Sequence, residues 1–193
     1  MKEREELNKD ARWKYVELVD QALLDVEKIP VPVTAAINGQ ALGGGTELTL
    51  VCDIRLSIAD ADFGLTETGI GIILKGSIVC LLRDRHDGMN SVLTYTAAHF
   101  STARMAEMKF LHQVVDDVAD LQEMSLVLAQ QIAGNAPLAL RAAKIVKLEL
   151  AAGRTSEALQ RAEAVRRKLD GTQDCLEELV AFAENRDPEF TDA

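Results

Sequence analysis

Apolar side chains recur every three to four residues along residues 8–28, with charged residues between them. This spacing predicts one amphipathic helix. The helix must end before Pro30 and Pro32, because proline disfavours helical backbone at and before its own position. The apolar face of the predicted helix consists of Trp13, Val16, Val19, Leu23 and Val26.

The pattern then changes to short apolar runs separated by turn residues. β-branched residues and short length favour strands over 33–37 and 53–59, with a brief extended piece at 63–64. A glycine run opens a helix over 44–52. This alternation of strands and helices predicts an α/β fold.

Helical periodicity dominates the rest of the chain. Residues 66–71 read as a loop and residues 113–115 as a last strand. The stretch 72–85 is ambiguous, with 78–82 helical and 83–88 a charged loop. The further helices are predicted over 90–98, 101–110, 119–133, 137–152, 156–169 and 172–184. We therefore divide the chain into an α/β core, residues 1–117, and a helical region, residues 118–193.

Composition narrows the classes of partner. Hydrophobic residues make up 48% of the 193 residues, enough for a real core. A net charge of −10 argues against nucleic acid or an anionic membrane surface as the main partner. No apolar run approaches the roughly 18 residues of a transmembrane helix.

The chain shows no targeting pattern at its start. The segment Met1-Lys2-Glu3-Arg4-Glu5-Glu6 is charged and acidic, unlike a signal or transit peptide. Cys52, Cys80 and Cys175 lack the spacing of a disulfide framework or a Cys-x-x-Cys site, and we expect free thiols. A cytoplasmic location is the matching expectation.

Candidate chemistry centres on the glycine run. Gly43, Gly44 and Gly45 open a helix whose first N–H groups have no partner within the helix and can stabilise a developing negative charge. Glu47 follows in the first turn, and Glu67 lies in a later loop. Two carboxyls beside such donors suit proton transfer next to a carbonyl. Taken singly, Glu47 also fits a helix-start glutamate and Glu67 a solvated loop charge.

Other familiar sites are absent from the sequence. The glycine run lacks the Gly-Lys-Ser/Thr of a phosphate loop, and neither a G-x-G-x-x-G nor a G-x-S-x-G motif occurs. His86, His99 and His112 are too scattered to predict a metal site.

Three segments resemble the crotonase superfamily, the enoyl-CoA hydratases and isomerases. They are 32–48, which contains the glycine run and Glu47, the step Cys52-Asp53-Ile54-Arg55, and Phe63-Gly64-Leu65-Thr66-Glu67. Residues 136–139 and 182–190 also resemble the last helices of the family. The resemblance therefore extends over nearly the whole chain.

This resemblance implies a spiral of ββα turns with C-terminal helices that form a homotrimer, often a dimer of trimers. It implies an acyl-CoA substrate, fatty acid metabolism, and no cofactor besides the coenzyme A of the substrate. Gly44 matches a backbone donor to the thioester oxygen, flanked by Gly43 and Leu42. Glu47 matches the base that acts on water, and Glu67 the group that delivers a proton to Cα.

Two departures from the family leave alternatives open. Met1-Lys2-Glu3 resembles the end of the loop that carries the other oxyanion donor, so we expect that donor and the opening β-turns to lie before Met1. Lys75 stands where hydratases carry glycine, and it either crowds the pocket or pairs with a carboxylate. The leading hypothesis is a hydratase. The alternatives are a truncated, inactive oligomerisation or regulatory protein, and an isomerase of the same family.

Overall fold

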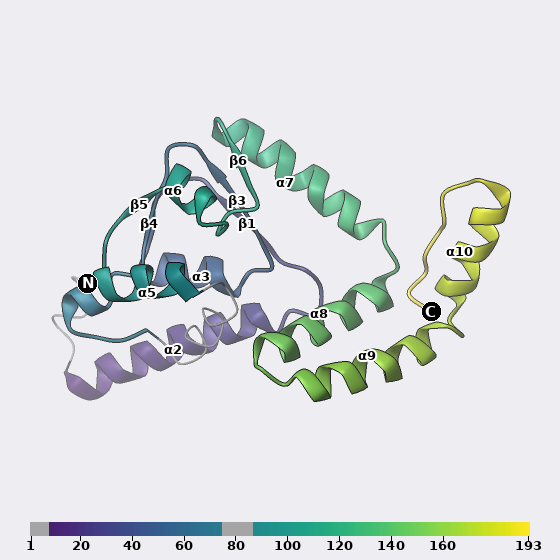
Figure 1. Cartoon of the computed structure of the whole chain (residues 1–193), viewed down its shortest axis with the longest axis horizontal. Coiled ribbons are helices and arrows are strands. Elements are labelled where there is room, and N and C mark those ends of the chain that lie inside the picture. The colour runs from purple at the N-terminus through teal and green to yellow at the C-terminus, as the bar shows by residue number, and fades with distance from the viewer. Residues whose placement is uncertain (1–7, 75–86) are drawn as a thin grey trace.

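The computed structural model describes residues 8–74 and 87–193, and these residues form two small sheets with helices around them (Figure 1). The first sheet is parallel, in the order β1-β3-β6. The second has the order β2-β4-β5, with β2 and β4 parallel and β4 and β5 antiparallel. The strands are β1 (Thr34–Ile37), β2 (Ala41–Leu42), β3 (Ile54–Ile58), β4 (Asp62–Gly64), β5 (Phe100–Ser101) and β6 (Gln113–Val115).

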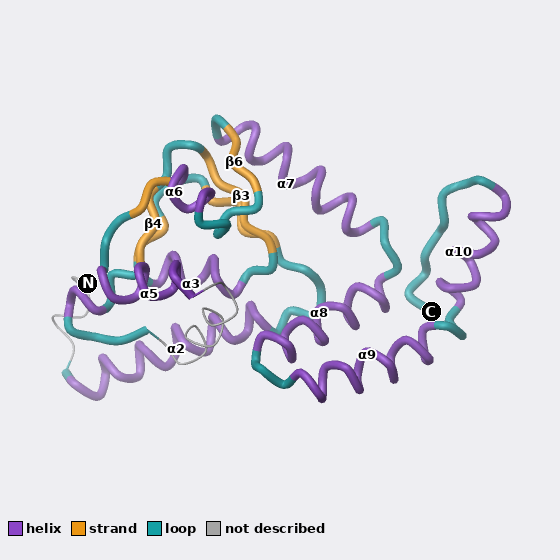
Figure 2. Tube along the Cα trace, viewed as in Figure 1, coloured by secondary structure: helices purple, strands orange, loops and turns teal. Residues whose placement is uncertain are grey.

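Helices make up most of the described chain, as the purple segments of Figure 2 show. Helix α7 packs against all three strands of the parallel sheet. Helices α8 and α9 pack on each other and lead away from the sheets toward α10 (Figure 1). The helices are α2 (Lys9–Glu27), α3 (Gly44–Val51), the 3-10 helix η1 (Thr68–Ile70), α5 (Asp87–Thr96), α6 (Thr102–Glu107), α7 (Val118–Ala133), α8 (Pro137–Ala151), α9 (Thr155–Leu169) and α10 (Gln173–Glu184).

Helix α2 confirms the element predicted from its apolar spacing. The Asn8 side chain caps it by accepting the N–H of Ala11 at 2.9 Å, and the helix stops before Pro30. Leu23 is buried in the core, but Trp13 is 66% exposed. The predicted apolar face is therefore covered by the rest of the described chain only toward the end of the helix.

Two strands were not predicted, and α5 and α6 differ by up to three residues from the predicted bounds, whereas the other predicted helices agree to within about one residue at the ends compared. Strands β2 and β5 have two residues each and exist through their pairing with β4. Helix α5 begins at Asp87, inside the segment predicted as a charged loop. Helix α6 ends at Glu107, before the predicted residue 110, because Lys109 takes a positive φ of 57° that no helix continues. The helix predicted over 78–82 lies outside the described residues.

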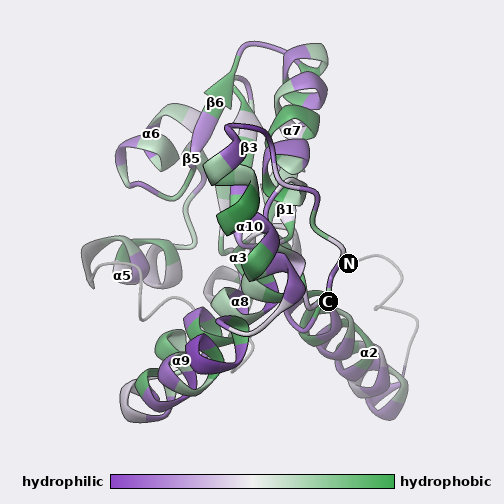
Figure 3. Ribbon diagram, turned by 90° about the vertical axis from the view of Figure 1, so that its right-hand side faces the viewer, coloured by the Kyte–Doolittle hydropathy of each residue, from purple (hydrophilic) through white to green (hydrophobic). Residues whose placement is uncertain are grey.

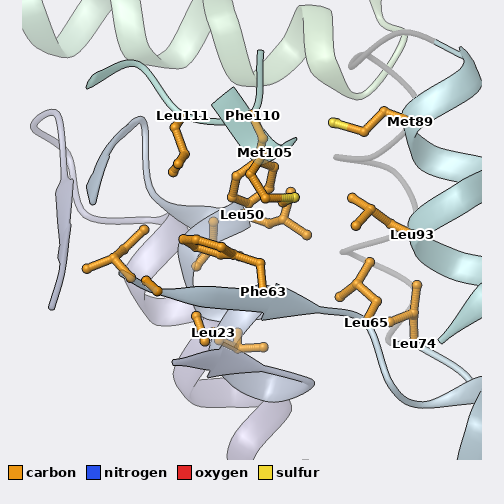
Figure 4. Close-up of a cluster of buried hydrophobic side chains, with 14 residues drawn as sticks. Leu23, Leu50, Phe63, Leu65, Leu74, Met89, Leu93, Met105, Phe110 and Leu111 are labelled. Carbon is orange, nitrogen blue, oxygen red and sulfur yellow. The ribbon is translucent and has the colours of Figure 1, made fainter. Parts of the chain in front are cut away.

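The core joins the second sheet to α3, α5 and α6 (Figure 4). The rings of Phe63 and Phe110 meet edge to face with centroids 5.9 Å apart. The guanidinium of Arg55, also fully buried, lies over the Phe110 ring at 5.2 Å and donates from Nε to the Phe110 carbonyl. In Figure 4, Leu65 and Leu74 point toward Met89 and Leu93 of α5. This packing fixes α3 and the segment after β4 relative to each other.

A buried lysine links α8 to the core. Lys144 of α8 donates to the Asp53 carboxylate and to the Val31 carbonyl, at 2.9 and 2.8 Å. Further along, α10 turns exposed apolar side chains to solvent, visible as green on its ribbon in Figure 3. The boundary at residue 117 between core and helical region stays a prediction, and α7, which follows it, packs on the sheet.

Candidate active site

Glu47 lies inside the protein although it belongs to the first turn of a helix. Helix α3 begins at Gly44, and Glu47 is only 3% exposed. The positive end of the helix dipole favours a carboxylate at this position. A surface helix-start glutamate would be solvated, whereas burying a carboxyl is costly unless its charge is compensated. Glu47 is therefore not a solvated surface glutamate, and its carboxyl lies at the positive end of the α3 dipole.

Glu67 is also buried, at 8% exposure, so it is not a solvated loop charge. It follows β4 and precedes the 3-10 turn η1. Its backbone carbonyl accepts the N–H groups of Ile70 and Ile72, both at 3.1 Å. These two bonds curl the loop around Glu67 and define where its side chain starts.

Each of the two carboxyls lies against one of two consecutive glycines. A Cβ placed on Gly43 would stand 3.0 Å from Oε1 of Glu67. A Cβ placed on Gly44 would stand 3.8 Å from Oε2 of Glu47. Two carboxylates, one from the helix and one from the loop after β4, thus face the backbone at the start of α3.

The backbone N–H groups at the start of α3 differ in their hydrogen-bond partners. Gly43 donates its N–H to the carbonyl of Gly64 at 2.7 Å, which continues the pairing of β2 with β4. Gly44 is the first residue of α3, so its N–H has no acceptor within the helix, and Gly44 is exposed. Leu42 lies half-buried in β2, paired with Gly64. Of these residues, Gly44 has the N–H group best suited to a bound oxygen.

One residue of this region was not singled out from the sequence. Thr46 is fully buried between the glycine run and Glu47, and its hydroxyl bonds to the backbone of Gly64. The sequence showed only a threonine next to Glu47, near the start of the predicted helix. Its partner is 18 residues away, so the sequence did not reveal the contact.

Several candidate residues lie outside this site. Lys75, with Cys80 and His86, falls among the residues that the structure does not describe. His112 accepts the Arg55 N–H on Nδ1 at 3.1 Å, which is a structural contact. Within the described chain, no group of three or more histidine, cysteine, aspartate or glutamate residues could hold a metal ion.

Cys52 and Cys175 are free thiols, as predicted. Burial raises the pKa of the Cys52 thiol, although Arg55 opposes the shift, so this sulfur stays protonated at neutral pH. None of the helices in residues 8–74 and 87–193 has both the length and the apolar content to cross a membrane.

Comparison with known proteins decides the family. The model of the family described as "Enoyl-CoA hydratase/isomerase" matches residues 1–193. The chain belongs to this family. Among solved structures, the enoyl-CoA hydratase of Bacillus anthracis superposes with a TM-score of 0.91 at 36% identity, covering all of this chain and 75% of that one. The α/β crotonase-type fold with C-terminal helices is thereby confirmed.

Curated relatives are similar over nearly the whole chain. The "Probable enoyl-CoA hydratase 2, mitochondrial" of Arabidopsis thaliana is 34% identical over 192 residues, covering 99% of this chain and 64% of the relative. The "Methylglutaconyl-CoA hydratase, mitochondrial" of Mus musculus is 31% identical over 200 residues, covering 98% of this chain and 62% of the relative. The chain thus spans less than two thirds of the length of these two relatives.

Proposed function

We propose that this protein is an enoyl-CoA hydratase, which adds water across the 2,3 double bond of an enoyl-CoA thioester. The observation that carries the proposal is that Glu47 and Glu67 are both buried and lie against Gly44 and Gly43, respectively, at the start of α3. A water held between two carboxyls next to a backbone donor has what hydration requires.

The proposed steps use this chain's groups in order. Glu47 takes a proton from the water as its oxygen bonds to C3 of the substrate. The electron pair of the double bond moves toward the thioester, giving an enolate whose oxygen accepts the N–H of Gly44. Glu67, which enters the cycle protonated, then delivers its proton to C2, and the proton held by Glu47 returns to Glu67 before the next turnover. Water is consumed and no other reactant is needed, so the proposal assigns no cofactor and no metal.

The test is the loss of enoyl-thioester ultraviolet absorbance with crotonyl-CoA and a longer enoyl-CoA. We expect turnover by the wild type and a loss of about 10²–10⁴-fold in kcat for both Glu47→Gln and Glu67→Gln. Glu149→Gln is the matched control, since Glu149 is equally buried but pairs with Arg161 in the helical region. Turnover at the wild-type rate in either site variant would refute the assignment.

An isomerase of the same family is the second candidate. Moving a double bond between positions 2,3 and 3,4 needs a single group that carries a proton between C2 and C4. An isomerase would therefore convert a 3-enoyl-CoA and depend on only one of the two glutamates. A folded protein that turns over neither substrate would favour the inactive oligomerisation or regulatory role.

We further propose that the chain assembles as a homotrimer or a dimer of trimers through its C-terminal helices. Large apolar side chains of α10 are exposed: Leu176, Leu179, Val180 and Phe182. Phe182 is 82% exposed, which is costly for a side chain of this size in water. Light scattering of the wild type and of Phe182→Asp tests the proposal. We expect a trimer or hexamer to dissociate in the variant, and a monomeric wild type would refute it.

A further inference from the structure

The hydroxyl of Thr46 binds the backbone of both segments that lead to the two carboxyls. Oγ1 donates to the carbonyl of Ala41 in β2, and the carbonyl of Gly64 in β4 lies 3.1 Å away as a second acceptor. Oγ1 also accepts the N–H of Gly64 at 3.1 Å. Thr46 is 0% exposed, so no water competes for these bonds.

Thr46 and its partner Gly64 are both close in sequence to the two candidate glutamates. Thr46 directly precedes Glu47, and Gly64 is three residues before Glu67. A shift of Gly64 relative to Thr46 would therefore change the separation of the two carboxyls. The β2–β4 pairing also ties these segments, and the bond from the Gly43 N–H to the Gly64 carbonyl at 2.7 Å extends it. That bond fixes the strand to the residue before the helix and does not reach the turn that carries Glu47.

We propose that Thr46 is a positioning residue that sets the spacing between Glu47 and Glu67. Its hydroxyl donates to the Ala41 carbonyl and accepts the Gly64 N–H, so it links β2 to β4 at the turn of α3 that leads to Glu47. The inference rests on the proposed function, since the spacing matters for a water held between the carboxyls. Small displacements of reacting groups cost rate steeply.

The chain offers a matched control in Thr102. This residue is 1% exposed, and its hydroxyl accepts the Ala61 N–H at 3.2 Å. It also has two carbonyl acceptors, Ile58 at 2.9 Å and Ala61 at 3.0 Å. Thr102 thus has the same burial and the same kind of bonds as Thr46, but it ties the turn between β3 and β4 to α6. Neither glutamate adjoins it.

The experiment compares Thr46→Val, Thr46→Ser and Thr102→Val in the full chain. Valine matches the shape of threonine and removes the hydroxyl, whereas serine keeps the hydroxyl. We expect Thr46→Val to lower kcat about 10²-fold with KM unchanged, and Thr46→Ser to recover most of the loss. Both valine variants are expected to lower the melting temperature by similar amounts. In Thr102→Val, however, kcat should stay at the wild-type value. Equal losses of kcat in both valine variants, or none in Thr46→Val, would overturn the proposal.

A second readout needs no turnover and separates this inference from the proposed function. The carboxyl carbons of Glu47 and Glu67 are titrated by ¹³C NMR in the wild type and in each variant. We expect at least one of the two midpoints to move in Thr46→Val and neither to move in Thr102→Val. A wild type without hydratase activity that still shows this difference would refute the function and leave the positioning role standing. Unchanged midpoints in Thr46→Val would refute the positioning role. Thr46→Ala, which cannot overfill the site, is measured alongside in case the valine variant does not fold.

Discussion

The carboxylate of Glu67 lies against the bare Cα of Gly43. A Cβ on Gly43 would stand 3.0 Å from Glu67 Oε1 and 3.3 Å from Thr66 Oγ1, and Gly43 also has a positive φ of 53°. We therefore expect Gly43→Ala to displace the carboxyl and lower kcat by about 10²-fold. Gly43 has φ 53° and ψ −121°, which an alanine rarely adopts, and this strain adds a loss of unfolding free energy of about 1–3 kcal/mol. Hydration kinetics and urea unfolding measure the two effects.

Gly39→Ala is the control for this substitution. No heavy atom lies within 4 Å of a Cβ added at Gly39. Its kcat is expected to equal that of the wild type. If Gly43→Ala also kept the wild-type kcat, the position of the Glu67 carboxyl during turnover would not depend on the missing side chain at Gly43.

The lack of a side chain at Gly64 allows β4 to pack closely against the backbone of Ala98. A Cβ there would lie 2.7 Å from the carbonyl oxygen of Ala98, a backbone atom that cannot swing away. We expect Gly64→Ala to lower the free energy of unfolding by about 1–3 kcal/mol, as overpacking does. Urea unfolding followed by circular dichroism measures the change.

Gly45→Ala is the control for Gly64→Ala, because we expect it to raise the free energy of unfolding instead of lowering it. Gly45 is exposed in α3, and a Cβ there meets only the Ala41 methyl at an ordinary 3.8 Å. Alanine loses less backbone entropy than glycine in a helix, so we expect a gain of about 0.5–1 kcal/mol. Equal effects of the two substitutions would contradict the packing described around Gly64.

The sequence predicted those elements whose pattern is local. Helix α2, helix α3 and strand β6 follow from apolar spacing, from the glycine run and from a β-branched pair, and all three are confirmed. Strands β2 and β5 could not be predicted, because two residues carry no periodicity and their pairing partner β4 is distant in the chain.

The candidate site was predictable only in part, because residue types can be read from the sequence but contacts between distant residues cannot. Glu47 and Glu67 could be chosen from residue type and from the family resemblance, and their roles stay a prediction. That both are buried over Gly43 and Gly44 depends on the three-dimensional packing of β4 against α3. The bonds of Thr46 to Gly64 likewise required coordinates, since no local pattern links positions 18 residues apart.

Asp53 couples the helical region to the core through a pH-dependent contact. Burial raises the pKa of Asp53, but the hydrogen bonds from the Val33 N–H and from Lys144, together with the charge of Lys147, outweigh burial and lower it. A carboxyl with a lowered native pKa stabilises the fold above its unfolded pKa of about 3.9, and this contribution is lost as the pH falls through the native value.

We therefore expect Asp53→Asn to destabilise the protein at about pH 7 by about 2–3 kcal/mol, because Lys144 is left buried beside a neutral amide. The difference from the wild type should shrink as the pH falls below about 4. Lys147→Met is the control: its side chain is 56% exposed and the pair is long at 3.3 Å, so we expect less than about 1 kcal/mol. A destabilisation by Asp53→Asn that did not vary with pH would contradict the charge-based argument.

Glu177 and Arg186 fold the end of the chain back onto α10. Arg186 binds the Glu177 carboxylate with two nitrogens, at 2.6 and 3.1 Å, and Oε1 also accepts the Glu189 N–H at 2.9 Å. The Arg186 hydrogen bond, followed by that of Glu189, lowers the pKa of Glu177 to about 2. The contact is therefore complete above the ordinary glutamate pKa of about 4.3 and is lost only as the pH falls through about 2.

In Arg186→Met, the midpoint of a ¹³C titration of the Glu177 carboxyl should move back toward about 4.3. Arg167→Met removes a comparable exposed pair with Glu163 and should leave this midpoint unchanged. A wild-type midpoint near the ordinary value would mean that the tail does not hold this contact in solution.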